Sequence, residues 1–155
     1  LLDSANVLDR YNAVMKDGAT PFLLQFRTVV AADDPVVTIA KIAMNAPGIV
    51  NATALASSTL TPHIFYAVGN KLHKYETTSN VSSEVFNLPA GETVTQMDYV
   101  RAAAGTGLQR LVVATWNGTE GKVYYFNISS VGDLGSNYTK VFNGFKKIID
   151  FVYKY

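Results

Sequence analysis

The feature that most constrains the fold of this chain is a repeat of about fifty residues. Residues 64–67 (IFYA) are similar to residues 111–114 (LVVA), which follow 47 positions later. After a turn, residues 71–75 (KLHKY) are similar to residues 122–126 (KVYYF), at an offset of 51. Self-similarity at a nearly fixed period is typical of a supersecondary unit that a chain uses more than once. We therefore expect copies of one structural unit.

A third pair of segments supports this repeat. Residues 97–100 (MDYV) are similar to residues 149–152 (IDFV), at an offset of 52. Short runs rich in Val, Ile, Phe and Tyr recur between polar turns, a pattern that predicts strands. The runs are residues 21–26, 36–44, 63–68, 71–76, 84–88, 94–100, 110–116, 122–128 and 147–155. Helical periodicity is limited to residues 1–15 and 99–107, and glycines interrupt the second of these segments.

Four strands in about 50 residues indicate a blade of a β-propeller. The sequence therefore predicts an all-β chain of about two and a half four-stranded, propeller-like blades. A ring needs about four to eight blades, so we expect the chain to belong to a larger ring. The expected parts are the end of a preceding blade with connecting strands (1–47), two blade-like repeats (48–92 and 93–144) and the leading strand of a further or closing blade (145–155). The alternative is a self-contained β-sandwich of some nine strands.

The segment HIFYAVGNKLHKYE, residues 63–76, predicts a hairpin with a two-residue turn at Gly69 and Asn70, because glycine accepts the positive φ of a primed turn. This turn sets His63 opposite Glu76 and places His63 and His73 on opposite faces of the hairpin. The two imidazoles therefore cannot bind one metal ion together. We expect His73 to be packed between blades and His63 to pair with Glu76 at a blade edge.

No familiar catalytic or metal-binding pattern occurs. The chain has no cysteine, which excludes disulfides and thiolate ligands, and it has no zinc-ligand spacing, P-loop or nucleophile elbow. We therefore predict no catalytic residues, no metal site and no cofactor. The candidate ligand-binding residues are Trp116 and Asn117 in the turn TWNGTEG, where an exposed indole ring would suit a sugar or a partner protein. Core packing of Trp116 at the end of the hairpin is the alternative.

Asp98 and Asp150 occupy equivalent positions of the repeat. The equivalence favours a shared structural role, such as accepting hydrogen bonds from backbone amides at a turn. The alternative is a pair of acids for glycoside hydrolysis, because carboxylates on separate blades can converge near a propeller axis.

The charge of the chain bears on its partners. Thirteen basic and twelve acidic residues give a net charge of +1, and the basic residues are scattered along the sequence. This distribution argues against nucleic acid as a partner. No apolar run reaches the 18 or so residues that a transmembrane helix needs. The sequence begins with a leucine, so we expect either a processed N-terminus or a piece of a longer chain.

These segments together resemble the C-terminal region of the PKD-like surface lipoproteins of Bacteroidetes. The shared features are HIFYAVGNKLHKYE, then RLVVATWNGTEGKVYYFNIS, and a terminal Gly-Phe-x-Lys-Ile-x-Asp-x-Val-Tyr-Lys pattern. The pattern is met at Gly144, Phe145, Lys147, Ile148, Asp150, Val152, Tyr153 and Lys154. The resemblance covers roughly residues 45–155 and, more weakly, residues 21–26. It implies an exported protein, associated with the outer membrane at the cell surface or the periplasmic face, beside SusC/SusD-like transporters.

The resemblance and the residues together favour a non-catalytic surface module. Its expected role is that of an accessory glycan-binding or docking subunit of a SusC/SusD-like nutrient uptake system, with transporter subunits or other surface lipoproteins as partners. One alternative is a propeller-type glycoside hydrolase or lyase that uses Asp98 or Asp150. Another is a general protein-interaction propeller.

Overall fold

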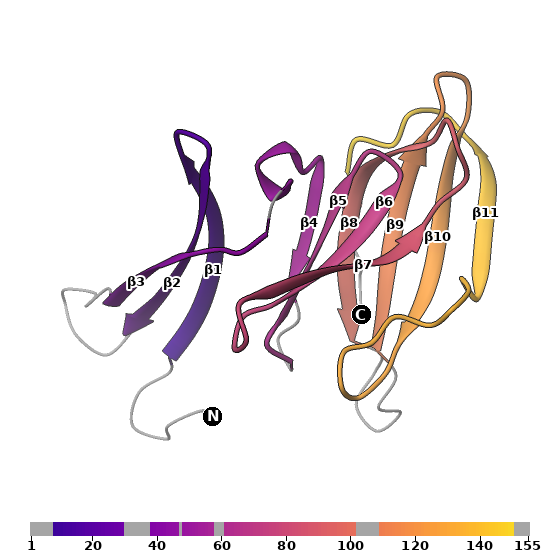
Figure 1. Cartoon of the computed structure of the whole chain (residues 1–155). Coiled ribbons are helices and arrows are strands. Elements are labelled where there is room, and N and C mark those ends of the chain that lie inside the picture. The colour runs from indigo at the N-terminus through magenta and orange to yellow at the C-terminus, as the bar shows by residue number, and fades with distance from the viewer. Residues whose placement is uncertain (1–7, 30–37, 47, 58–60, 102–108, 151–155) are drawn as a thin grey trace. The chain divides into compact units, whose positions relative to one another are not determined.

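The computed structural model describes residues 8–29, 38–46, 48–57, 61–101 and 109–150 of the 155 residues. In these ranges the chain forms eleven strands in three antiparallel sheets (Figure 1). The predicted all-β class is confirmed, and the one helical turn of the described part is the short 3-10 segment Ile49–Asn51. None of the described residues belongs to a helix that has the length and apolarity needed to cross a bilayer.

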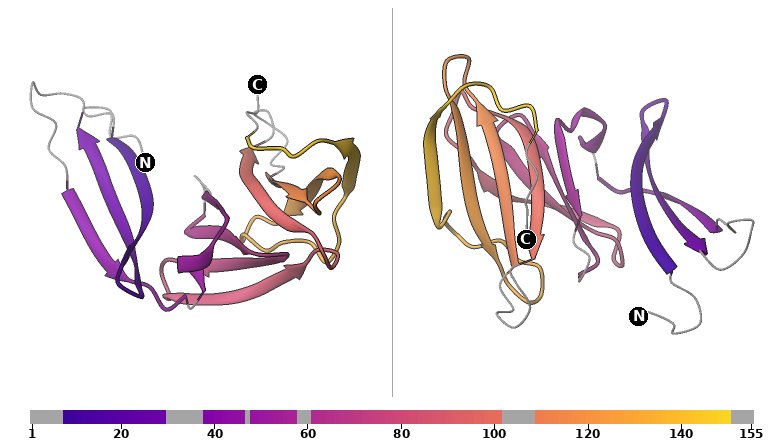
Figure 2. Two further views of the ribbon diagram at one scale, coloured as in Figure 1. Left: turned by 90° about the horizontal axis from the view of Figure 1, so that it is seen from above. Right: turned by 180° about the vertical axis from the view of Figure 1, so that it is seen from behind.

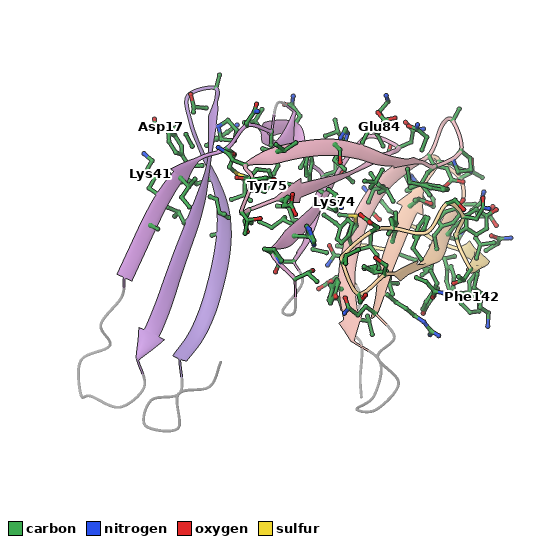
Figure 3. All side chains as sticks on the ribbon, turned by 60° about the horizontal axis from the view of Figure 1, so that its bottom comes forward. Asp17, Lys41, Lys74, Tyr75, Glu84 and Phe142 are labelled. Carbon is green, nitrogen blue, oxygen red and sulfur yellow. The ribbon has the colours of Figure 1, made fainter. Side chains whose placement is uncertain are left out.

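The chain divides into two compact units, and the first comprises Leu1–Val50. It contains a sheet of three antiparallel strands in chain order: β1 (Leu8–Asp17), β2 (Thr20–Val29) and β3 (Thr38–Ala43). The helix that the periodicity of residues 1–15 indicates is wrong for residues 8–15, because β1 pairs with β2 along its whole length. Tertiary pairing here overrides local periodicity, since the hairpin turn at Gly18, with a φ of 60°, brings the two segments together. An exposed ion pair of 3.5 Å joins Lys41 and Asp17 (Figure 3).

The second unit, Asn51–Tyr155, contains two four-stranded sheets. The β4–β7 sheet comprises β4 (Ala54–Ser57), β5 (His63–Val68), β6 (Lys71–Glu76) and β7 (Val81–Asn87). The β8–β11 sheet comprises β8 (Thr93–Arg101), β9 (Gln109–Trp116), β10 (Gly121–Ile128) and β11 (Lys140–Phe145). The strands follow one another in chain order in both sheets, so the four-stranded antiparallel pattern expected of each repeat is confirmed. The described sheets form no closed ring and no propeller arrangement.

The central hairpins of the two sheets have the same register. The predicted pairing of β5 with β6 is confirmed, from His63 opposite Glu76 to Val68 opposite Lys71. Gly69 has the positive φ, 62°, that this turn requires. In the second copy Ala114 lies opposite Val123, just as Ala67 lies opposite Leu72 in the first. The longer turn of the second hairpin therefore leaves the pairing unchanged.

One hydrophobic core lies between the two sheets, which Figure 2 shows from above and from behind. Alternate residues of β4, β5, β9 and β10 point into it, as period-two patterning requires. The β4–β7 sheet contributes Ala54, Ala56, Phe65, Ala67 and Leu72, and the β8–β11 sheet contributes Val94, Met97, Leu111, Val113, Tyr124, Phe126 and Ile128. The first strands of the two sheets, β4 and β8, lie against each other.

The C-terminal segment after β11 differs from the expected leading strand of residues 145–155. Phe145 ends β11, and residues 146–150 have no regular secondary structure, while residues 151–155 lie outside the described residues. The segment returns to the first strand of its sheet, where Gln96 Nε2 donates a 2.6 Å hydrogen bond to Asp150 Oδ1. The carbonyl oxygen of Lys146 lies above Gly121, so close that a Cβ there would be 2.4 Å from it. Because Gly121 has no Cβ, the backbone at Lys146 can pass this close to β10.

Candidate functional site

Two aromatic residues flank a glycine at the turn end of the β8–β11 sheet. Gly121 pairs with Trp116 of β9 on one side and with Phe145 of β11 on the other. Directly paired residues of neighbouring strands share a face, so both aromatic side chains lie on the same side of the sheet. Trp116 is half-buried, and Phe145 is 42% exposed. We call Trp116, Asn117 and Phe145 the aromatic platform.

The turn beside this platform is held in place by polar contacts. Asn117 is exposed, and its Oδ1 accepts hydrogen bonds from the backbone amides of Thr119 and Glu120, at 2.9 and 2.8 Å. Glu120 Oε1 in turn accepts a 2.8 Å hydrogen bond from the backbone amide of Gly144. These contacts connect the β9–β10 turn to β11. The two predicted ligand-binding residues therefore lie next to each other on a well-braced turn, and Phe145 is an additional member that the sequence did not single out.

A buried carboxylate network lies inside the same sheet. Glu92 is almost completely buried just before β8, and it accepts hydrogen bonds from side chains of β9 and β10. Thr115 Oγ1 donates to its Oε2 at 2.8 Å, and Lys122 Nζ donates to its Oε1 at 2.7 Å. The Tyr124 hydroxyl lies 2.9 Å from both oxygens. A carboxylate with this many donors is a structural centre, because buried charge is stable only when it is paired and hydrogen-bonded.

The electrostatics of this network follow from these contacts. The hydrogen bond from Lys122 to Glu92 raises the pKa of the Lys122 ammonium, and so keeps it charged. Burial first, and then the hydrogen bond to Glu92, raises the pKa of the Tyr124 hydroxyl well above its ordinary value. Both donors thus stay protonated, and their protons remain shared with Glu92. One feature of the sequence points to part of this network. By the repeat, Thr115 and Lys122 are equivalent to Val68 and Lys71, which pair across the first hairpin, and the structure shows the same pairing in the second.

His63, the first residue of β5, is buried, with 4% of its side chain exposed. Its Nε2 lies 3.3 Å from Glu76 Oε1, so the predicted contact between these residues is present. A hydrogen bond from Ser79, and then that from His63, lowers the pKa of Glu76. Within the described part of the chain, His63 Nδ1 has no hydrogen-bond partner. It lies against Gly132, where a Cβ would be only 2.0 Å from it.

The loop that carries Gly132 also makes an ion pair with the other sheet. Lys74 of β6, labelled in Figure 3, donates a 2.5 Å hydrogen bond to Asp133 Oδ1. The hydrogen bond and charge of Lys74 lower the pKa of Asp133. Lys74 and His63 lie on the same face of the β5–β6 hairpin, so this face holds the loop that follows β10.

His73 lies on the opposite face from His63, as the register predicted. Its ring stacks on Tyr66, with a centroid separation of 4.8 Å and an interplanar angle of 11°. Burial lowers the pKa of His73, and the nearby Glu84 acts in the opposite direction. These contacts give His73 a packing role, and no three potential metal ligands gather anywhere among the described residues.

Asp98 and Asp150 come near each other on the outer face of β8. Burial raises the pKa of Asp98, a hydrogen bond from the backbone amide of Tyr99 opposes this change, and the negative charge of Asp150 adds to the increase. Asp150 is held beside Asp98 by Gln96, which lies on the same strand. The structure thus brings together two carboxylates that the sequence related only through the repeat.

Comparison with known proteins adds no assignment, because neither a protein-family model nor a curated protein matches this chain.

Proposed function

We propose that this chain is a non-catalytic binding module that takes a glycan on the aromatic platform. The observation that carries the proposal is the pair of aromatic side chains, Trp116 and Phe145, on one face across Gly121. Aromatic rings offer apolar faces to the C–H groups of a sugar ring, while polar neighbours such as Asn117 can bind its hydroxyl groups. The braced turn would favour binding, because side chains that are already ordered lose little entropy when a ligand binds.

Glycan-array binding tests the proposal directly. We expect Trp116→Ala and Phe145→Ala each to weaken glycan binding at least tenfold, about 1.4 kcal/mol of binding free energy. Leu55→Ala is the matched control, because Leu55 is a similarly exposed apolar side chain, at 43%, on the β4–β7 sheet. Binding that survives both platform substitutions would show that the sugar lies elsewhere, and an empty array with the natural protein would refute the glycan.

The proposed setting of this module is the outer membrane. The resemblance to PKD-like surface lipoproteins supports an accessory subunit of a SusC/SusD-like uptake system, exported and held at the cell surface or the periplasmic face. Affinity capture from detergent-solubilised membranes should then recover transporter subunits. Capture of other proteins together with an empty glycan array would favour the general protein-interaction module instead.

We also propose that the two four-stranded sheets are successive blades of a propeller-like repeat. Three features support this reading: both sheets have strands in chain order, the first strands β4 and β8 lie against each other, and the last strand of one sheet, β7, leads directly into the first strand of the next. A self-contained β-sandwich remains the alternative architecture.

A glycoside hydrolase is the second candidate function, and the Asp98–Asp150 pair favours it. Glycosidases use one carboxyl group with a raised pKa as the general acid and a second, ionised carboxylate as nucleophile or base. Asp98 has the raised pKa, and Asp150 is exposed beside it. Asp98→Asn and Asp150→Asn should each abolish polysaccharide turnover under this hypothesis, whereas unchanged turnover would remove both residues from the chemistry.

A further inference from the structure

Equivalent residues of the two repeats face opposite ways relative to the shared core. The register of the hairpins makes Phe65 equivalent to Val112, and Ile64 equivalent to Leu111. Phe65 points into the core from the β4–β7 sheet, whereas in the β8–β11 sheet it is Leu111 that points into it. We call the face that carries Phe65 in the β4–β7 sheet, and Val112 in the β8–β11 sheet, the front face, and the opposite face the back face. The front face of the β4–β7 sheet therefore packs against the back face of the β8–β11 sheet.

In the β4–β7 sheet, the front face is covered by the β8–β11 sheet. The equivalent face of the β8–β11 sheet can be compared with it residue by residue. Phe86 of β7 lies opposite Leu72, and Phe142 of β11 lies opposite Val123, so Phe86 and Phe142 are equivalent. Phe86 packs edge-on against Phe126 of the neighbouring sheet, with ring centroids 4.8 Å apart. Phe142 is 39% exposed and contacts Tyr125 and Lys140 of its own sheet. Among the described residues, Phe142 thus has no aromatic contact of the kind that Phe126 supplies to Phe86.

The two halves of this front face differ in burial. Val112 and Ala114, near β8, are buried, whereas Tyr125 is half-buried and Phe142 exposed toward β11. The buried half is where the returning segment places Asp150 beside Gln96. In the repeat, Asp150 is equivalent to Asp98, which lies in β8, the first strand of its sheet. The chain therefore reaches this face with the residues that would begin the first strand of a following sheet.

We infer that the front face of the β8–β11 sheet, centred on Phe142 and Tyr125, is an interface for a further four-stranded sheet of the same repeat, contributed by the same polypeptide. The partner sheet should carry an aromatic residue at the position that Phe126 holds in the β8–β11 sheet. The inference rests on the repeat architecture proposed above. The aromatic platform lies at the turn end of the same face, so a sheet that covered the whole face would exclude a glycan there. Continuity favours a sheet in the same chain, because residues 146–150 already lead onto this face.

An extended chain tests the interface. Residues 1–148 are joined to residues 97–155, so that a second copy of the repeat follows at the natural offset of 52. A double-mutant cycle then pairs Phe142→Ala with Phe126→Ala of the appended copy. We expect the unfolding equilibrium to show a coupling of roughly threefold to tenfold, which is the range for an aromatic pair. The Phe86 and Phe126 cycle in the natural chain gives the reference value.

Two results would overturn the inference. One is an appended copy that unfolds in a separate transition, with no coupling to Phe142. The other is concentration-dependent dimerisation of the natural chain that Phe142→Ser abolishes, which would make a second copy the occupant of this face. Glycan binding by the natural chain is measured separately through Trp116→Ala, so failure of the proposed function leaves the coupling result intact, and the reverse also holds.

Discussion

The hydroxyl group of Tyr124 bridges both carboxylate oxygens of Glu92, at 2.9 Å from each. This contact joins the middle of β10 to the residue just before β8, which are strands that do not pair with each other. Together with Thr115 and Lys122, it fixes the entry of the chain into the second sheet. Polar contacts of this kind hold an element in one position where apolar packing alone would allow several.

Loss of the Glu92 carboxylate should destabilise the fold. We expect Glu92→Ala to lower the free energy of unfolding by about 2–4 kcal/mol, because it leaves Lys122 and Tyr124 with unpaired polar atoms. Glu92→Gln should cost less, since the amide oxygen still accepts a hydrogen bond. Urea unfolding measures both values. Glu84→Gln, which breaks an exposed ion pair with Lys71, is the control and should change little.

A methyl group at Gly132 should disrupt the contact between its loop and His63. Gly132 has a φ of 84°, and an added Cβ would fall 2.0 Å from His63 Nδ1. We expect Gly132→Ala to cost about 2–4 kcal/mol from backbone strain and overpacking together. Gly144→Ala is the matched control, because its φ of 86° is similar and nothing lies within 4 Å of the added atom.

The double variant Gly132→Ala/His63→Ala separates these two causes. Removal of the imidazole relieves the steric clash and leaves the backbone strain. The double variant should therefore be more stable than the sum of the single changes predicts. Strict additivity in thermal unfolding would mean that the loop avoids His63 by moving.

The raised pKa of Asp98 predicts a pH-dependent effect on stability. Burial is its main cause, so the folded state holds the Asp98 proton to a higher pH than the unfolded state does. Stability then falls as the pH rises from the ordinary aspartate range, about 4, through the raised pKa, and the loss is complete above it. We expect Asp98→Asn to raise the melting temperature at pH 7 and to have little effect near pH 3. A gain that is equal at both pH values would contradict this account.

Substitution of Gly121 should release the returning C-terminal segment. A Cβ at Gly121 would lie 2.4 Å from the carbonyl oxygen of Lys146, so Gly121→Ala must displace this backbone. The segment contains Lys146 and Lys147, and we expect faster cleavage there by trypsin under native conditions. Gly135→Ala provides the control, because Gly135, like Gly121, has no positive φ and its added atom would come no closer than 3.5 Å to a neighbour. An unchanged cleavage rate would show that the segment is held elsewhere.

The sequence predicted the central hairpins well and several outer strands poorly. The Gly69-Asn70 turn was enough to define every pair of the first hairpin, because a two-residue loop fixes the register. Strands β4 and β11 were missed. β4 is the alanine-rich segment ALAS, with little intrinsic strand propensity, and it forms because β5 offers it a pairing edge. β11 contains Gly144 with a positive φ, which interrupts the pattern of a strand.

The candidate site was predictable to a smaller degree. Trp116 and Asn117 stood out because an aromatic ring beside an Asn-Gly turn is visible in the sequence. Phe145 joins them only through the pairing of β10 with β11, which local sequence does not encode. The Glu92 network combines residues 23 to 32 positions apart along the chain, and only the completed sheet brings them together.

Packing of a front face against a back face has a consequence for assembly. An interface between two identical faces is complete once two sheets have met, whereas an interface between unlike faces always leaves one of each kind for a further addition. Such growth ends only when the last sheet meets the first or when a terminal surface discourages addition. Lys140, whose ammonium lies 4.5 Å from the centre of the Phe142 ring, places a charge on this growing end.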